Sequence, residues 1–385
     1  MGKIDELIKE LCPNGVLTYP LWSLTAWDKK FNAVDKSMQR KIIKYKYLLA
    51  KDLENLIEED GDIRILYTTK DIAFTTEEKA GDFISEGEIV AIPWGGNVSV
   101  KYYKGKFVTG DNRIATSIDT SVLDNKYLFY WMENSIDVIE SFYRGAGIKH
   151  PSMLSVLTLE IPLPPLSIQQ QIVEILDTFT DSISNLQEEL ELREKQMEYY
   201  RENLLSFDGE EVEYVKLGGI CEIKRGIRVI KKELSDSGVY PVFQNSLTPL
   251  GYYDKTNCAA DKTFIIMAGA AGEIGYTDEP IWAADDCFYI DTKDTLYNKY
   301  TFYNLLNCQH YLKSKVRKAS IPRLSRNFIE DLLIPLPPLS RQQEIVDILD
   351  TFESMIANIK QEIELRQKQY EYYREKLLNF ERKKA

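Results

Sequence analysis

The sequence lacks several features that mark metalloenzymes, secreted proteins and membrane proteins. Only two of its 385 residues are histidine, His150 and His310, and neither lies in a pattern typical of a metal site. The five cysteines include no Cys-x-x-Cys pair, which argues against both a zinc site and a disulfide framework. No apolar stretch approaches the length of about 18 residues that a membrane span needs, and the N-terminus lacks the apolar core of a signal peptide. We therefore expect a cytoplasmic protein of two or three domains that contacts no membrane.

The chain also lacks the motifs of nucleotide-driven motors and of adenine methyltransferases. No glycine-rich segment ends in the Gly-Lys-Ser/Thr of a phosphate-binding loop. Both Pro-Pro pairs occur as Leu-Pro-Pro-Leu, and neither forms the Asn/Asp-Pro-Pro-aromatic loop of such methyltransferases. Acid-x-Lys triplets such as Glu222-Ile223-Lys224 resemble a nuclease core, but chance produces them in a chain this rich in glutamate and lysine. The prediction is a protein with no catalytic or metal-ligating residues and no cofactor of its own.

Positive charge is scarce overall but is concentrated in three runs. The formal net charge is −12, which by itself argues against a nucleic-acid partner. However, residues 29–51 contain eight lysines and arginines with a single acid, and residues 224–232 and 313–326 contain five and six with no acid. Because phosphate binding depends on where the cations lie, these runs predict a surface that can bind DNA. The alternative is that each run is a solvated helix face.

The strongest pattern is an internal duplication. Residues 161–167, Ile-Pro-Leu-Pro-Pro-Leu-Ser, recur unchanged at 334–340. The similarity continues to Phe207 and Phe380, with roughly two-thirds of the aligned positions identical. Chance does not produce a repeat of this length, so the two segments are expected to have the same structure.

Each copy of the repeat predicts one long helix with an apolar seam. The helices are expected to begin after the prolines, at capping boxes formed by Ser167 with Gln170 and by Ser340 with Gln343. Beyond each cap the apolar residues recur at spacings of four and three, which is typical of a coiled coil. The predicted seam residues are Ile172, Leu176, Phe179, Ile183, Leu186, Leu190, Ile345, Leu349, Phe352, Ile356, Ile359 and Ile363. At about 1.5 Å per residue, each helix is on the order of 55 Å long.

We expect the two helices to pair with each other as an antiparallel coiled coil. Arg193 and Arg366 interrupt the two seams at the same register, and a charged seam residue tends to fix the pairing partner. Since each helix follows its own globular segment, such pairing would hold two domains apart. The N-terminal helix, residues 1–11, resembles the end of a third helical unit, so a circular arrangement with a pseudo-two-fold axis is expected. The alternative is a coiled-coil scaffold that joins proteins without recognising DNA.

The segments between the helices predict two mixed α/β domains. Residues 12–160 and 209–333 differ in sequence, but each has a short initial strand, an apolar strand with a glycine-rich turn, and a basic stretch before the prolines. The glycine-rich turns are Trp94-Gly95-Gly96 and Gly269-Ala270-Ala271-Gly272. The predicted fold class is α+β, with these domains separated by helical spacers at residues 161–208 and 334–385.

This order of two different domains and two near-identical helices resembles the DNA-specificity subunits of Type I restriction-modification systems. The most specific similarity is the sequence Pro-Leu-Pro-Pro-Leu-Ser-x-Gln-Gln-x-Ile-Val that heads both helices, and residues 3–16 are similar to the family as well. The resemblance implies two target-recognition domains, each reading one half of a bipartite site in double-stranded DNA. It also implies helices that set the gap and dock two modification subunits, which use S-adenosylmethionine to methylate adenine. Separate motor and restriction subunits would use ATP and Mg.

Cations and amide side chains of the two domains are the candidates for DNA contact. Phosphate contacts position a protein on the duplex, whereas arginine suits guanine and asparagine or glutamine suits adenine in the major groove. The predicted phosphate-binding residues are Lys29, Lys30, Arg144, Lys149, Lys224, Arg225, Lys231, Lys232, Lys313, Lys315, Arg317 and Lys318. The predicted base-contacting residues are Asn112, Arg113, Arg228, Gln244, Asn245, Arg323 and Arg326. A solvated surface position is the alternative for each of them.

Overall fold

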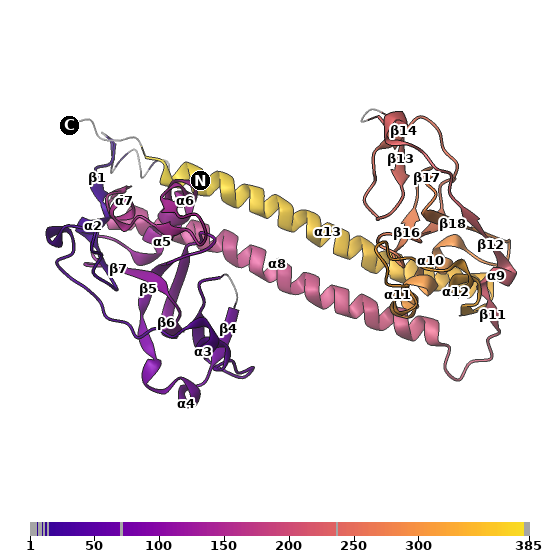
Figure 1. Ribbon diagram of the computed structural model, residues 1–385, viewed down its shortest axis with the longest axis horizontal. Helices are drawn as coiled ribbons and strands as arrows, with labels where there is room; N and C mark the ends of the chain where they lie inside the picture. Colours follow the sequence, from indigo (N-terminus) through magenta and orange to yellow (C-terminus); the bar gives the residue numbers. More distant parts are fainter. Residues whose placement is uncertain are drawn as a thin grey trace. The chain divides into compact units, whose positions relative to one another are not determined.

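The structure groups the chain into two compact units (Figure 1). This computed structural model describes residues 6, 10, 12, 13, 15–69, 72–235 and 238–380. The first unit comprises Met1–Asn185 and Ile363–Ala385, and the second comprises Leu186–Glu362. The C-terminal part of the last helix, from Ile363, therefore belongs to the first unit, which confirms the expected circular arrangement. The helix predicted for residues 1–11 lies almost wholly outside the described residues.

The first unit is built on a six-stranded sheet covered by a helix. The strand order is β2-β7-β5-β6-β3-β4, and all neighbours are antiparallel except β3 and β6. Val90 and Ile92 of β5 are buried in one apolar cluster with Tyr127 and Trp131 of α5. The strands are β1 (Thr18–Pro20), β2 (Thr25–Trp27), β3 (Ile63–Leu66), β4 (Ile72–Thr75), β5 (Ser85–Pro93), β6 (Lys101–Thr109), β7 (Asn112–Ser117), β8 (Tyr143–Arg144), β9 (His150–Pro151) and β10 (Glu160–Pro162). The helices are α2 (Leu21–Leu24), η1 (Lys36–Met38), α3 (Ala50–Glu54), α4 (Glu77–Ala80), η2 (Gly81–Phe83), α5 (Asn125–Asn134), α6 (Ile136–Ser141) and α7 (Met153–Leu157).

The second unit contains a four-stranded and a three-stranded sheet. The four-stranded sheet has the order β12-β18-β15-β16, and the three-stranded sheet has the order β14-β13-β17. Ile265 of β15 and Ile290 of β18 are buried in one cluster with Tyr300 and Tyr303 of α10. The strands are β11 (Tyr214–Lys216), β12 (Cys221–Arg225), β13 (Tyr240–Phe243), β14 (Tyr252–Tyr253), β15 (Lys262–Ile266), β16 (Ile274–Thr277), β17 (Trp282–Ala283), β18 (Cys287–Thr292) and β19 (Leu333–Pro335). The helices are α9 (Leu217–Ile220), η3 (Lys231–Glu233), α10 (Asn298–Asn307), α11 (Gln309–Ser314) and α12 (Arg326–Glu330).

The two units share one framework despite their different sequences. The order β12-β18-β15-β16 repeats the order β2-β7-β5-β6, and the initial pairing of β11 with β19 repeats that of β1 with β10. From α5 onward the two copies run without insertion or deletion, because each element of the second unit begins 173 residues after its counterpart in the first. These elements begin at 125, 136, 153 and 160 for α5, α6, α7 and β10, and at 298, 309, 326 and 333 for α10, α11, α12 and β19. The duplication thus begins well before residue 161, where the long sequence repeat begins.

The two long helices, α8 (Leu166–Ser206) and α13 (Leu339–Leu378), pair in antiparallel fashion within each unit. In the second unit Tyr200 stacks on Phe352 with ring centroids 5.2 Å apart, while Glu194 pairs with Lys360. In the first unit Phe179 stacks on Tyr373 at the same distance. The pairing confirms the predicted antiparallel coiled coil. Both helices begin one residue before the predicted caps, at Leu166 and Leu339.

The N-terminal turns of both helices belong to the cores of the two units. Ile172 and Leu176 are buried in the core of the first unit, and Ile345 and Leu349 are buried in that of the second. Ile363 is buried as well. The remaining predicted seam residues, Phe179, Ile183, Leu186, Leu190, Phe352, Ile356 and Ile359, are half-buried. The predicted seam is therefore apolar and covered along both helices, most completely where a domain packs on it.

Candidate nucleic-acid interface

The base-contact candidates of the first unit are withdrawn, because the structure uses both side chains internally. Asn112 is 2% exposed, and its amide donates to the carbonyl oxygens of Leu66 and Tyr67 at 2.9 and 3.3 Å. Arg113 is 4% exposed and lies with its guanidinium 4.0 Å from the ring centroid of Trp94. A side chain that is buried and already hydrogen-bonded cannot reach a base edge without breaking the domain core.

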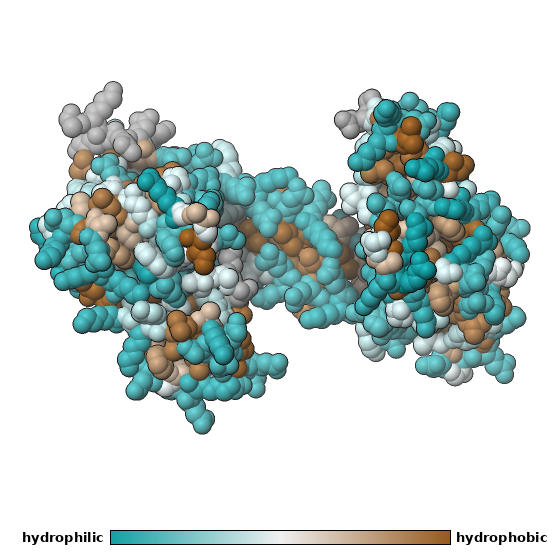
Figure 2. Space-filling model, viewed as in Figure 1, coloured by the Kyte–Doolittle hydropathy of each residue, from teal (hydrophilic) through white to brown (hydrophobic). Residues whose placement is uncertain are grey.

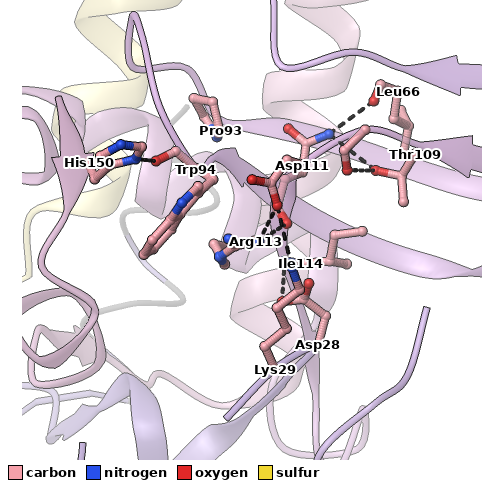
Figure 3. A network of polar contacts seen from close by, with 12 residues as sticks. Asp28, Lys29, Leu66, Pro93, Trp94, Thr109, Asp111, Arg113, Ile114 and His150 are labelled. Atoms are coloured by element: carbon pink, nitrogen blue, oxygen red, sulfur yellow. Dashed lines mark hydrogen bonds and ion pairs between the residues drawn. The ribbon is translucent and has the colours of Figure 1, made fainter. Parts of the chain in front are cut away.

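Asp111 links two of the predicted cationic residues of the first unit (Figure 3). Its Oδ1 accepts from Arg113 at 2.9 Å and from Lys29 at 3.3 Å. Lys29 also lies 3.8 Å from the ring centroid of Tyr47. These two contacts hold the Lys29 side chain in place, and the Asp111 carboxylate offsets part of the positive charge of Lys29 and Arg113. Lys30 beside it is exposed.

The glycine-rich turn after β5 contacts the predicted basic stretch. The backbone N–H of Gly96 donates to the carbonyl oxygen of Lys149 at 3.3 Å, and Arg144 pairs with His150 across the β8–β9 hairpin. Arg144 and Lys149 are exposed. Beside this hairpin lies a cavity of about 410 Å³, lined by residues that include Lys29, Lys30, Trp94, Arg113 and Met153. The structure therefore brings together three separate segments that the sequence marked as cationic or glycine-rich.

The second unit builds the same contact between its own turn and its own basic stretch. The backbone N–H of Gly269 donates to the carbonyl oxygen of Pro322 at 3.1 Å, which corresponds to the bond from Gly96 to Lys149 in the first unit. The backbones of Arg317 and Arg323 form an antiparallel β-bridge, as the backbones of Arg144 and His150 do in the β8–β9 hairpin. Each of these residues lies 173 positions after its counterpart. The two loop clusters are thus equivalent parts of one framework.

Other candidates of the second unit converge on the same loops. Asn245 is exposed, and its carbonyl oxygen accepts from Ala270 of the glycine-rich turn at 2.9 Å. Asp285 holds two neighbours, because its carbonyl oxygen accepts from Arg225 at 3.0 Å and its carboxylate accepts from Gln244 at 3.5 Å. We name the loop cluster of the first unit, residues 28–33, 94–97 and 143–151, cluster 1. The loop cluster of the second unit, residues 225–232, 244–246, 267–272, 285–286 and 313–324, is cluster 2.

Two candidates of the second unit are engaged by carboxylates. Lys224 donates to Asp291 at 2.6 Å, and this bond raises the pKa of Lys224 and lowers that of Asp291. Asp291 also accepts from Lys262 at 2.6 Å. Arg326 lies on α12 and pairs with Glu330 at 2.7 Å. The structure therefore gives Lys224 and Arg326 local partners and places neither of them in cluster 2.

The remaining cationic candidates of the second unit are exposed. Lys313, Lys315, Arg317 and Lys318 lie in or beside the segment that follows α11, and Arg228, Lys231 and Lys232 follow β12. The segment after β12 is fixed by its backbone, since Ile227 donates to Ala283 at 2.9 Å and accepts from the Trp282 indole at 2.9 Å. These residues are exposed, and the Nζ of Lys315 also lies 4.9 Å from the ring centroid of Tyr311.

Replacing Gly269 by alanine is expected to disturb cluster 2 more than the matching change in cluster 1. Gly269 has a φ of +84°, and a Cβ there would lie 2.7 Å from the carbonyl oxygen of Asn245. Gly96 has a φ of +92°, but a Cβ there meets nothing within 4 Å. We expect G96A to lower the free energy of unfolding by about 1–2 kcal/mol, the cost of a left-handed conformation, and G269A to lower it by more. Chemical denaturation of both variants checks this, and equal losses would contradict the close approach of Asn245.

Sequence reasoning missed the residues that fix each long helix to its domain. In the first unit Asp177 of α8 accepts from Tyr130 at 2.6 Å and from Lys126 at 2.8 Å. In the second unit Asp350 of α13 accepts from Tyr303 at 2.5 Å and from Lys299 at 3.0 Å. The tyrosine and lysine belong to the sequence Asn-Lys-Tyr-x-Phe-Tyr, which occurs at 125–130 and again at 298–303. This short repeat, at the same offset as the long one, was the signal available in the sequence.

Burial accompanies these bonds in both units. Desolvation and the hydrogen bond to the neighbouring carboxylate raise the pKa of Tyr130 and Tyr303, so both phenols stay protonated. A buried glutamine completes each attachment, because Gln169 donates to the carbonyl oxygen of Val122 at 2.8 Å and Gln342 donates to that of Thr295 at 3.0 Å. Each domain is therefore tied to the helix that follows it by the same set of polar contacts.

The described residues contain no group of three or more histidine, cysteine or acidic side chains that could hold a metal ion. Within the same part of the chain, no helix is long and apolar enough to cross a membrane.

Comparisons with known proteins agree with this framework. The family model described as the Type I restriction modification DNA specificity domain matches residues 32–193 and again residues 209–365. A putative type I restriction enzyme specificity subunit of Haemophilus influenzae is 30% identical over 334 residues, which cover 77% of this chain and 84% of that protein. The EcoR124I/EcoR124II specificity subunit of Escherichia coli is 28% identical, over 70% of this chain and 74% of its own length.

A solved structure shows the same fold. The crystal structure of a Type-I restriction-modification system S subunit from M. genitalium superposes with a TM-score of 0.70, covers 94% of this chain and 96% of its own, and is 19% identical. Each of the two matches to the family model lies largely within one of the two units. On the matches to the family model and to the Haemophilus relative, the chain belongs to the family of Type I restriction-modification DNA specificity subunits.

Proposed function

We propose that the chain reads a bipartite site in double-stranded DNA, with cluster 1 reading one half and cluster 2 reading the other. The observation that supports this most is that one framework presents two loop clusters with different side chains. Phosphate contacts can come from cations common to both clusters, such as Arg144 and Arg317, whereas base contacts must differ between two half-sites. All predicted phosphate-binding and base-contacting residues except Asn112 and Arg113 belong to this proposal. All of these except Lys224 and Arg326 lie in the two clusters.

We further propose that α8 and α13 set the gap between the half-sites and dock two modification subunits. The two helices are the most nearly identical parts of the chain, as expected for surfaces that bind two copies of one partner. The chain itself would be non-catalytic and bind no cofactor. Adenine methylation with S-adenosylmethionine would take place on the modification subunits, and ATP-driven motor and restriction subunits would complete the assembly.

The rival function is a coiled-coil scaffold that joins proteins without reading DNA. The exposed cations of both clusters argue against it, since a scaffold needs no paired arrangement of glycine-rich turns and basic loops. The two functions differ in one measurable property, which is salt-sensitive and sequence-selective DNA binding by the chain in complex with its modification subunit.

Charge reversal in cluster 2 is expected to weaken DNA binding without changing sequence preference. Lys231 and Lys232 are both exposed, so K231E/K232E removes two phosphate contacts and adds two repulsive charges. We expect affinity to fall by about tenfold or more on every sequence, and the slope of log K against log salt to decrease by about 2. Titration of the complex at several salt concentrations measures both quantities.

The control for this variant reverses two exposed lysines outside both clusters. K104E/K106E changes the net charge by the same amount on β6, where the two lysines pair with Glu88 and Glu77. We expect this control to retain most of the affinity and the salt slope. Equal losses in both double variants would mean that net charge alone drives binding. Absence of any selective binding by the unaltered complex would favour the scaffold.

A further inference from the structure

His150 and Arg323 occupy the same position in the two units. Each is the partner of an arginine across an antiparallel pair, Arg144 for His150 and Arg317 for Arg323. Each follows a residue whose carbonyl oxygen accepts from the glycine-rich turn, Lys149 for His150 and Pro322 for Arg323. Five residues lie between Arg144 and His150, and five lie between Arg317 and Arg323, so the two loops align without a gap.

The contacts of His150 fix the direction of its ring (Figure 3). Nδ1 lies 2.7 Å from the carbonyl oxygen of Trp94, and the two rings lie 5.2 Å apart at an angle of 38°. Because a carbonyl oxygen can only accept, Nδ1 carries the proton in this contact. Nε2 of the neutral ring is then an acceptor, and within the described part of the chain no hydrogen bond occupies it. The residue is exposed.

Arg323 is fixed in the same place by different contacts. Its Nη1 lies 3.5 Å from Oδ1 of Asp286, and its side chain is 53% exposed. Asp286 takes the place of Asp111 of the first unit, because the carbonyl oxygen of each accepts from an equivalent backbone N–H two residues before the second glycine position. The donors are Met267, two residues before Gly269, for Asp286 and Trp94, two residues before Gly96, for Asp111. The guanidinium keeps further N–H donors for a ligand.

We propose that His150 and Arg323 are equivalent specificity-determining residues, each contacting a base in the half-site that its unit reads. The proposal rests on the proposed function of reading DNA. The acceptor Nε2 of His150 suits an exocyclic amino group, the N6 of adenine or the N4 of cytosine, in the major groove. The donors of Arg323 suit the O6 and N7 of guanine. His150 is thereby the base-contacting residue of the first unit, in place of the buried Asn112 and Arg113.

The geometry also explains why the two clusters can differ at this position. The backbone bonds that hold the loop come from Gly96 and Gly269, and they involve no side chain of the reading residue. A change of the reading residue therefore leaves the loop in place. The group that orients the side chain also differs between the clusters. It is Trp94, through its carbonyl oxygen and its indole, for His150, and the carboxylate of Asp286 for Arg323.

The test uses the full chain in complex with its modification subunit and a pool of DNA sites randomised at each position of both half-sites. Sequencing of the methylated products gives the base preference at every position. We expect H150A to reduce discrimination about tenfold at one base pair of one half-site and to leave the other half-site unaltered. We expect R323A to do the same in the opposite half-site. H150R is expected to move the preference at its position toward guanine, which a purely structural role would not do.

The matched control is H310A, which removes the only other histidine, an exposed residue of α11. We expect it to leave the half-site read through His150 unaltered. If the unaltered complex shows two half-sites and H150A and H150R keep full discrimination at every position, the inference is wrong while the proposed function stands. If the unaltered complex shows no sequence preference in either half, the proposed function itself fails. Thermal unfolding of each variant separates lost reading from lost folding.

Discussion

A chain in which a second copy of residues 209–333 replaces residues 12–160 is expected to direct methylation to a site whose two halves are the same sequence on opposite strands. The reason is that the duplicated framework offers the transplanted domain the same attachment. Ile172 and Leu176 stand where Ile345 and Leu349 stand, and Asp177 stands where Asp350 accepts from Tyr303 in the native unit. The reader is therefore exchanged while its support stays the same.

One pair of framework residues needs adjustment for this exchange. In the first unit Glu133 accepts from the hydroxyl of Tyr370 at 2.6 Å. The equivalent positions in the second unit are Leu306 and Met197, so the transplanted domain would leave the phenol of Tyr370 without its acceptor. Including Y370M restores the native match, and we expect it to recover about 1–3 kcal/mol of stability in the hybrid.

The expected effect of the exchange is large. Specific sites bind about 10³-fold or more tightly than unrelated DNA, so methylation of the original first half-site should fall by at least that factor. Methylation of the symmetric site should appear, and the second half-site should be unaltered. The reciprocal hybrid, with two copies of residues 12–160, serves as the control and should show the first half-site twice. A hybrid that still requires the original first half-site would contradict independent reading by the two units.

Insertion of one heptad into both long helices is expected to change the gap and leave both half-sites unaltered. A seven-residue insertion keeps the apolar seam in phase, because the seam repeats every 3.5 residues. Placed after Glu189 in α8 and after Glu362 in α13, it adds about 10 Å of helix, or at most about three base pairs along the duplex. Methylation at the native gap should fall by about 100-fold or more, and methylation at a longer gap should replace it.

Two results distinguish a spacer from a mere attachment. The control inserts the same seven residues into the exposed turn at Glu59 and Asp60, where the gap should stay unaltered. If the heptad insertions leave the native gap unaltered in a folded protein, the helices do not set the spacing. If they change the bases read in either half-site, the units do not read independently of the helices.

The sequence was sufficient to predict the helices, because their period is local. The apolar residues recur three and four positions apart, a spacing that neighbouring residues alone reveal. The pairing of the helices and the burial of Ile172, Leu176, Ile345 and Leu349 could therefore both be predicted. The start of the duplicated framework was not predicted, because α5 and α10 share only the short sequence Asn-Lys-Tyr-x-Phe-Tyr. The role of this short sequence follows from the structure, in which its second tyrosine donates a hydrogen bond to Asp177 or Asp350, far along the chain.

The candidate site was predicted less completely, for a physical reason. Residue type alone marks Asn112 and Arg113 as readers of bases, but strand pairing buries both beside Trp94 and Leu66. His150 was noted only for its lack of metal-ligand neighbours, since its contacts come from a turn more than fifty residues earlier. Long-range pairing decides which polar side chain faces solvent, and this pairing is absent from local patterns.

The most direct test maps adenine methylation in DNA from the host with the gene for this chain present and deleted. Two readers on a duplicated framework predict methylated sites with two short defined halves around a gap of constant length, all of which disappear on deletion. Methylation that persists after deletion, or that follows one uninterrupted sequence, would contradict a chain that reads two separate half-sites.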